Sequence, residues 1–415
     1  MEFQKAPKYT GKTMSLLLLM SLTVAAGVYR NGFPAMFPFI HAEFGLSRTV
    51  MGLYISFLYL VSAALAIFAG WIADRLGAKK GILIGMGSLT ILIFAHIFAP
   101  SFNIILVLAA LCGIGFSIVS PGATKGVTDL FSPSRRGTAM GILFMGWSIG
   151  GLAGSAFLPV VAQYFGWRSA TVLMGGYMLI TITVFQIYFK EGSGIDLTNT
   201  QSPTATQTSE KFNLKEGFRL LLENKKLHLL CLRAFVLGSV SGTLAAHYTL
   251  FVHLDYGYSM VFSGIGFAFL NAGSVLGRPA WGLINDRLLK GREDIGFLLI
   301  NFLNALVFAL FVLFYRFTEV PAVGIILAAT FIAGFSTRGW PGVFFAAVSR
   351  DADRGNTGMS AGLALVFVRL GITLSPPVFG FIADITGSYE YSWILMVLFT
   401  LISGVGFFLK KEAPN

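Results

Sequence analysis

Long apolar segments, each about 20 residues and separated by short polar stretches, follow one another along nearly the whole chain. A helix of that length spans the hydrocarbon core of a bilayer, roughly 30 Å thick. Twelve such helices need about 240 residues, and 55% of the 415 residues are hydrophobic. Only 12% are charged, against about 25% in soluble domains. This pattern excludes a soluble enzyme, a disordered chain and a coiled coil.

The apolar segments therefore predict an all-α membrane protein with twelve transmembrane helices. The predicted spans are residues 14–39, 49–73, 80–99, 104–128, 138–163, 168–189, 227–254, 260–285, 295–315, 320–348, 357–385 and 391–409. A polar stretch divides them into an N-terminal six-helix half (1–189), a cytoplasmic linker (190–226) and a C-terminal six-helix half (227–415). Within the linker, residues 213–226 predict a short amphipathic helix on the membrane surface.

Lysine and arginine are unequally distributed between the two sides of the predicted bundle. Of 30 basic residues, 21 lie on the side of both termini and 3 in the opposite loops. An excess of basic residues marks the cytoplasmic side. We therefore expect a multi-pass protein of the plasma (inner) membrane with both termini in the cytoplasm. Because the net charge of +11 has this topological origin, we expect no nucleic-acid partner.

A short motif occurs in both halves, between the second and third span of each. The first copy reads Gly70-Trp-Ile-Ala-Asp74-Arg75-Leu-Gly77-Ala-Lys79-Lys80, and the second reads Gly282-Leu-Ile-Asn-Asp286-Arg287-Leu-Leu-Lys290-Gly-Arg292. Glycine allows close approach of helices, and the acid can pair with arginine or with a helix N-terminus. We expect a conformational latch, a contact that holds one state and is released in another. Its residues are Gly70, Asp74, Arg75, Asp286 and Arg287.

This motif resembles the cytoplasmic loop motif of the major facilitator superfamily, Gly-x-x-x-Asp-Arg-x-Gly-x-Lys-Lys. The match is nearly complete in the first half and degraded in the second. With the twelve spans and the central linker, the resemblance covers the whole chain. It implies two pseudo-symmetric six-helix halves around a midplane site, working by alternating access. A generic basic turn would explain the charges but not their repetition.

Six basic residues remain inside the predicted spans. They are Arg30, Lys125, Arg233, Arg278, Arg338 and Arg369. Lys125 and Arg233 lie near cytoplasmic ends, where their side chains can snorkel. Each deeper charge costs about 2.5–3.5 kcal/mol on insertion scales. Since the acids lie near helix ends or in loops, a bound anion is the simplest compensating partner. Arginines bonded to backbone carbonyls of broken helices are the alternative.

Polar residues share helix faces with some of these arginines, which favours a water-filled cavity. The face-sharing sets are Asn271, Ser274 and Arg278; Ser239, Thr243 and His247; and Arg369 and Thr373. Residues three, four and seven apart lie on one side of a helix. Small polar residues also hold membrane helices together, so packing is the alternative for each set.

Four local patterns resemble organic-anion carriers of the superfamily. The run Gly277-Arg278-Pro279-Ala-Trp281 resembles the eighth helix of the oxalate:formate antiporter and monocarboxylate transporter branch, which implies a carboxylate-binding arginine. The run Gly387-Ser-Tyr389-Glu-Tyr391 also resembles monocarboxylate transporters. Arg369 corresponds to a substrate-binding lysine of the oxalate antiporter. Arg30, fifteen residues before Gly45, resembles the arginine that contacts substrate carboxylate in anion:cation symporters.

The acids that proton-coupled relatives carry are replaced here. Ser274, Tyr29 and Ser117 stand at those positions. We therefore favour anion exchange over proton symport. His247 leaves proton coupling open because histidine titrates near neutral pH, although hydrogen-bonded packing is the alternative. A drug or neutral-solute carrier would leave the buried arginines unexplained.

These observations predict a secondary transporter of organic anions, mono- or dicarboxylates. The expected substrate-binding residues are Arg30, Arg278, Arg369, Asn271 and His247. Further substrate or gating candidates are Arg338, Lys125, Tyr29, Ser274, Thr373 and Trp340. The sequence has no metal-ligand cluster, nucleophile–base pair or nucleotide-binding loop, so we expect no enzyme activity, cofactor or metal. The expected partners are a small organic anion and the lipid bilayer, and we expect a monomer.

Overall fold

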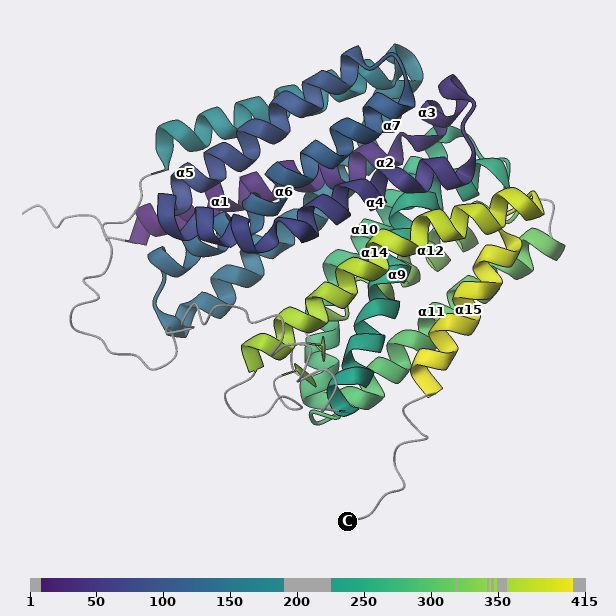
Figure 1. Ribbon diagram of the computed structural model, residues 1–415. Coiled ribbons are helices and arrows are strands. Elements are labelled where there is room, and N and C mark those ends of the chain that lie inside the picture. Colours follow the sequence, from purple (N-terminus) through teal and green to yellow (C-terminus); the bar gives the residue numbers. More distant parts are fainter. Residues whose placement is uncertain are drawn as a thin grey trace, which may run out of the picture. The chain divides into compact units, whose positions relative to one another are not determined.

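The structure is a computed structural model that describes residues 9–189, 225–317, 320–341, 343–344, 347–348 and 357–405. Every element of these residues is a helix (Figure 1). The predicted linker (190–226) and its predicted amphipathic helix (213–226) lie outside the described residues, except for residues 225 and 226. By their contacts the residues form two compact units.

Unit 1 comprises Met1–Phe33 and Val61–Ser202. Its helices are α1 (Tyr9–Gly27), the π-helical turn η1 (Val28–Gly32), α5 (Ala66–Ala95), the 3₁₀ turn η2 (His96–Phe98), α6 (Phe102–Leu130) and α7 (Pro133–Tyr188). Gly77 and Gly166 have φ angles of 83° and 81° and divide α5 and α7 each into two helices. Glycine adopts this backbone conformation easily because it has no Cβ. Both breaks fall between predicted spans.

Unit 2 comprises Pro34–Leu60 and Pro203–Asn415. Its helices are α3 (Phe37–Phe44), the first part of α4 (Arg48–Ala64), α9 (Lys225–Leu254), α10 (Met260–Leu283), η4 (Ile284–Leu288), α11 (Glu293–Phe317), α12 (Val323–Thr337), α14 (Thr357–Thr386) and α15 (Glu390–Val405). The short helix α2 (Phe33–Ala35) crosses the unit boundary. Pro34–Leu60 thus joins unit 2 by its contacts, although its sequence precedes the predicted linker. The predicted half boundaries at residues 189 and 227 describe the sequence repeat and stay a prediction.

The two units pair their helices in the same way. In unit 1, α1 packs on α7, α5 on α6 and α5 on α7; in unit 2, α9 packs on α14, α10 on α12 and α11 on α15. Gly150 meets the backbone of Val24 in the first unit, and Gly371 meets the backbone of Phe235 in the second. Such small residues let membrane helices approach closely. The repeat of the sequence motif therefore extends to the packing of the helices.

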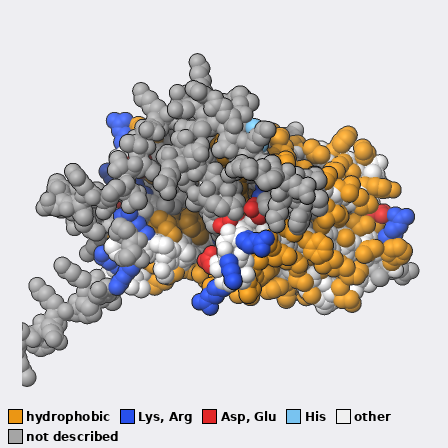
Figure 2. Space-filling model, turned by 90° about the horizontal axis from the view of Figure 1, so that it is seen from below, with side chains coloured by type: hydrophobic (Ala, Val, Ile, Leu, Met, Phe, Trp, Pro, Cys, Tyr) orange, Lys and Arg blue, Asp and Glu red, His pale blue; other side chains and the backbone are white. Residues whose placement is uncertain are grey.

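The described surface suits a lipid bilayer. Eight described helices are long and apolar enough to cross a membrane, and three shorter apolar helices accompany them. Large side chains such as Phe98, Phe157 and Phe317 are 81%, 70% and 75% exposed. Figure 2 shows a broad area of hydrophobic side chains, with lysine and arginine at its borders. An apolar surface of this extent is stable in lipid rather than in water, so the chain is a multi-pass membrane protein.

Candidate functional site

The contact between α10 and α12 brings together two of the predicted residues. Nη1 of Arg338 donates a hydrogen bond to Oδ1 of Asn271 over 2.9 Å. The guanidinium carbon lies 5.7 Å from the centroid of the Phe267 ring, and Nδ2 of Asn271 donates to the Phe267 carbonyl over 2.8 Å. Arg338 is 8% exposed and Asn271 is fully buried. A neutral amide and an aromatic ring thus orient a buried guanidinium at the end of α12.

Arg278 lies on the same helix as Asn271 and is half-buried. Since α10 is helical across both positions, Asn271, Ser274 and Arg278 share one face as predicted. Three residues later, Nε1 of Trp281 donates to the carbonyl of Phe335 on α12 over 3.0 Å. The run that resembles the carboxylate carriers therefore anchors this part of α10 to α12, which fixes the backbone that carries Arg278.

Arg369 and Thr373 lie on α14 beside the first part of α4. Arg369 is half-buried and interacts electrostatically with Tyr59. The Thr373 carbonyl accepts a hydrogen bond of 2.5 Å from the Ser56 hydroxyl. The α4 segment contributed by the N-terminal sequence is therefore a direct neighbour of this predicted pair.

His247 lies in a different network of unit 2. Its Nε2 is 2.8 Å from the Pro376 carbonyl and its Nδ1 is 3.1 Å from the Tyr389 hydroxyl. A carbonyl only accepts, so Nε2 carries the proton and Nδ1 accepts from the hydroxyl. The neutral imidazole satisfies both bonds, and the residue is fully buried. This geometry matches the packing alternative of the sequence analysis.

The candidates of unit 1 lie in two places. Arg30 lies in η1, half-buried, with its guanidinium 5.9 Å from the centroid of the Trp147 ring. Tyr29 beside it is 1% exposed. π-Helical turns of this kind occur frequently at functional sites. Nζ of Lys125 lies 3.7 Å from Oδ1 of Asp129, one turn away on α6, so this lysine has an acidic neighbour.

Arg233 does not snorkel as expected. It is 3% exposed, and its Nη1 lies 3.3 Å from Oδ1 of Asp294 in the first turn of α11. Its guanidinium also lies 5.0 Å from the Phe297 ring centroid. The ion pair links α9 to the first turn of α11, a contact that local sequence does not reveal.

The predicted latch residues lie on the surface. Asp74, Arg75, Asp286 and Arg287 are exposed, and Arg75 lies 5.0 Å from the Trp71 ring centroid. Nζ of Lys79 donates to the Phe189 carbonyl over 2.7 Å and ties the motif to the end of α7. Among the described residues nothing lies within 4 Å of a Cβ built at Gly70. The motif is therefore accessible at the surface, and Gly77 forms its turn.

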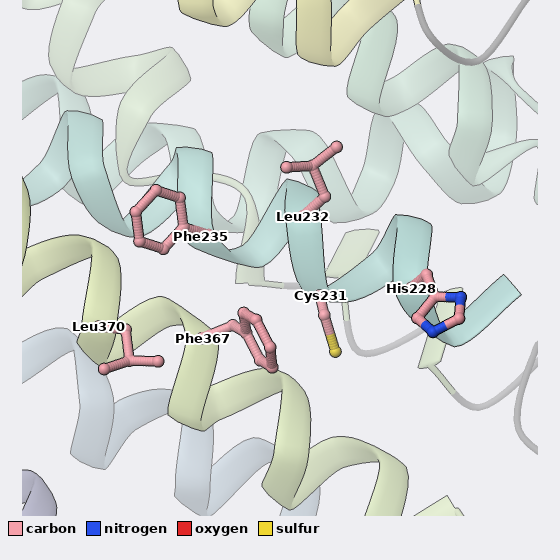
Figure 3. A pocket seen from close by; sticks show the side chains of 6 residues that line it. All are labelled: His228, Cys231, Leu232, Phe235, Phe367 and Leu370. Atoms are coloured by element: carbon pink, nitrogen blue, oxygen red, sulfur yellow. The ribbon is translucent and has the colours of Figure 1, made fainter. Parts of the chain in front are cut away.

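A pocket of about 330 Å³ opens between α9 and α14 (Figure 3). Its lining residues are His228, Cys231, Leu232, Phe235, Phe367 and Leu370. An apolar lining does not compensate the desolvation of a carboxylate. None of the expected substrate-binding residues is among the six that line this pocket.

Four residues that the sequence analysis did not select form a polar cluster at one end of unit 2. This outer cluster consists of Arg48, Asp255, Asp384 and Tyr389. Tyr389 lies in a run that resembles monocarboxylate transporters, which is a weak signal in the sequence. Trp340, which was selected, is 8% exposed and packs on the Phe344 ring with 5.1 Å between centroids.

A family model described as Major Facilitator Superfamily matches residues 18–368. The chain belongs to the Major Facilitator Superfamily. This superfamily consists of membrane transporters, which confirms the predicted fold class and the expectation that the chain is not an enzyme. A crystal structure of a bacterial homolog to the human lysosomal transporter Spinster, inward-facing and unoccupied, matches with a TM-score of 0.78 and 18% identity. The match covers 97% of both chains.

Several curated proteins are similar in sequence. The hexuronate transporter of Bacillus subtilis is 24% identical over 92% of this chain and 90% of its own length. The probable sulfoacetate transporter of Cupriavidus necator is 32% identical over 37% of this chain, but this alignment spans only 36% of that relative. The gallate transporter of Pseudomonas putida is 31% identical over 34% of this chain and 31% of its own length.

Proposed function

We propose that this superfamily member is a secondary transporter of organic anions, mono- or dicarboxylates, working by alternating access in the plasma membrane. Both termini lie in the cytoplasm, as the basic residues of the loops indicate. The observation that carries the proposal is the buried contact between Arg338 and Asn271 on the helix pair that also bears Arg278. A guanidinium is planar and can bind a carboxylate through two parallel hydrogen bonds.

The charge balance of unit 2 supports an anionic substrate. Its described acids lie in the first or last turns of helices or beyond them. They are Glu43, Asp255, Asp286, Glu293, Asp294, Asp384 and Glu390. Arg278 and Arg369 lie well inside α10 and α14, away from these helix ends. An anion bound between the helix ends would offset their positive charge where water is scarce.

The names of the relatives support the same substrate class. The hexuronate, sulfoacetate and gallate transporters are all named for organic acids. A shared substrate class in distant relatives fits a shared arginine-based recognition of the acid group. Arg30 in unit 1 is a further candidate for binding the acid group.

We favour exchange of anions over proton symport. Ser274 and Tyr29 stand where proton-coupled relatives carry acids. Both imidazole nitrogens of His247 have neutral hydrogen-bonding partners, which supports packing over proton transfer. Proton-coupled symport is the alternative and predicts a different response to a proton gradient.

The test is uptake of labelled anions into proteoliposomes that contain the purified full-length protein. The panel holds lactate, oxalate, succinate, a hexuronate, sulfoacetate, gallate and nitrate. Each anion is measured with and without the same unlabelled anion inside, and with and without an inward proton gradient. Stimulation by internal anion without a response to the gradient supports exchange. Gradient-driven uptake into empty vesicles supports symport, and no uptake of any organic acid refutes the proposed function.

A further inference from the structure

The outer cluster fastens the start of α4 to the end of α14. Oδ1 of Asp384 accepts the Arg48 backbone N–H at 2.8 Å, and Oδ2 accepts the backbone N–H and hydroxyl of Thr49 at 2.9 and 2.6 Å. The carboxylate thus caps the positive N-terminus of α4. A Cβ at Gly380 would lie 2.5 Å from the Arg48 carbonyl, so the two backbones are in close contact.

Arg48 directs its side-chain donors to carbonyls rather than to a carboxylate. Nη1 donates to Ala383 over 3.2 Å, and Nη2 donates to Gly387 over 3.1 Å. The guanidinium also lies 5.1 Å from the Tyr389 ring centroid. Arg48 therefore acts on a nearby acid through the electrostatic attraction of its charge and not through a hydrogen bond.

That acid is Asp255, directly after α9. Its side chain is 2% exposed, and its Oδ1 lies 3.6 Å from Nη2 of Arg48, beyond hydrogen-bond distance. Its Oδ2 accepts the Tyr389 backbone N–H at 2.6 Å. Burial raises the pKa of Asp255 to about 6, because it outweighs the opposing effects of that N–H and of Arg48.

We propose that Asp255 is a proton-binding site through which extracellular pH controls the contact of Pro34–Leu60 with α9 and α14. The carboxyl is buried while the contact is formed and regains water when the segment separates. The proton therefore binds more tightly to the formed contact and stabilises it. The meaning of this control for transport rests on the proposed function.

The direction of the effect follows from linkage. An acid with a higher pKa in one arrangement stabilises that arrangement as the pH falls, and this stabilisation is lost as the pH rises through the higher pKa. The pKa of Asp255 is about 6 here against an ordinary value of 3.8. Lowering the pH from 7 to 5 therefore favours the formed contact by about tenfold.

Other titratable groups lie near Asp255 and Arg48. They are Asp384 of α14, His41 of α3, His253 and Tyr256 at the end of α9, Tyr389 before α15, and Glu390 of α15, which pairs with Arg316 of α11. Burial and Arg48 lower the pKa of His41, so its protonation would weaken the contact as the pH falls. The sign of the pH response therefore distinguishes Asp255 from His41.

The experiment measures how often α4 separates from its neighbours. Met51, one turn after Arg48 on α4, is fully buried, whereas Ala42 on α3 is exposed. Met51→Cys and Ala42→Cys are made separately in full-length protein whose Cys112 and Cys231 are replaced by serine. A membrane-impermeant maleimide is applied from outside between pH 5 and 7.5. Dividing the labelling rate of Met51→Cys by that of Ala42→Cys removes the pH dependence of thiolate formation, which affects both rates.

We expect this ratio to fall about tenfold from pH 7 to 5, with a midpoint near 6. Asp255→Asn should keep the ratio low at every pH, because the amide resembles the protonated acid and still accepts the Tyr389 N–H. Asp255→Glu should retain a pH response, and Arg48→Gln should move the midpoint to higher pH. A response that survives Asp255→Asn, or that rises on acidification and disappears in His41→Gln, would overturn the proposal.

The same labelling measurement tests whether the site lies on the extracellular side of the membrane. Absence of labelling of Ala42→Cys from outside would overturn the extracellular position of the site. Because labelling needs no substrate, a failure of all anion uptake would refute the proposed function without changing this result.

Discussion

At the scale of single residues, two buried arginines of unit 2 contact side chains of different charge. Arg233 has a carboxylate partner, Asp294 at 3.3 Å, and thus joins two helices of unit 2. Arg338 donates from Nη1 to the neutral Asn271 amide at 2.9 Å, a contact that orients the guanidinium.

The first prediction concerns the geometry of the guanidinium. Arg278→Lys and Arg369→Lys should each reduce anion uptake at least about tenfold, because lysine lacks the planar fork that holds a carboxylate through two hydrogen bonds. Uptake per folded protein in proteoliposomes is the measurement. The matched control is Arg316→Lys at the surface, where the side chain is 63% exposed and pairs with Glu390. Wild-type uptake by both variants would refute the recognition role.

The second prediction concerns the buried ion pair. Asp294→Asn should lower stability by about 2–3 kcal/mol, because it leaves the Arg233 charge buried without its carboxylate, while the partial exposure of position 294 limits the loss. Thermal unfolding of the purified protein in detergent measures the effect. Asp129→Asn is the control, since that acid is 43% exposed beside Lys125 and should change stability by less than about 1 kcal/mol. Equal effects would contradict the structural role of Arg233.

At the scale of helices, the spacing of α10 and α12 sets the Arg338–Asn271 contact. Gly334 lies against the Leu270 carbonyl so closely that an added Cβ would overlap it. Gly334 thus sets the distance between the two helices at Leu270. Asn271, which follows Leu270 on α10, can therefore reach Arg338 at the end of α12. Small residues have this function in many membrane helix pairs.

The third prediction tests this crossing. Gly334→Ala should destabilise the protein by about 1–3 kcal/mol through overpacking and reduce anion uptake, because α10 and α12 must move apart. Gly324→Ala on the same helix is the control, since nothing described lies within 4 Å of its Cβ. That substitution should be neutral or slightly stabilising, as alanine favours helix more than glycine does. Thermal unfolding midpoints and anion uptake, measured for both variants, test these expected effects.

At the scale of the whole molecule, alternating access requires contacts that form in one state and break in another. The motif from Gly70 to Lys80 is accessible in this structure, with Asp74 and Arg75 exposed. The latch hypothesis assigns its contacts to another state of the cycle. The kinetics of transport test this assignment.

The fourth prediction follows from that hypothesis. Asp74→Asn should lower the maximal transport rate at least about fivefold and leave KM nearly unchanged, because a latch acts on the change of state and not on the bound anion. Initial uptake rates over a range of anion concentrations give both parameters. Asp129→Asn, another exposed acid of unit 1, should change neither. A large rise of KM at an unchanged maximal rate would contradict the latch role.

The sequence by itself determined the spans, the helical class and the family. Each predicted span has a helical counterpart among the described residues. The sequence suffices for this because the insertion of a helix into lipid depends on the hydrophobicity of its own 20 or so residues. The breaks at Gly77 and Gly166 were also predictable, because glycine marks tight turns locally. The face shared by Asn271, Ser274 and Arg278 follows from helical period alone.

The tertiary structure alone decided which residues meet. Arg48 and Asp384 are 336 positions apart in the sequence and form a hydrogen bond, and Pro34–Leu60 joins the unit of the C-terminal helices. Arg233 pairs with Asp294 on another helix, and His247 lies within hydrogen-bond distance of Tyr389, directly before α15. Hydropathy and periodicity specify a helix and its faces but not its neighbour, because the pairing of helices depends on close packing and on hydrogen bonds between distant segments.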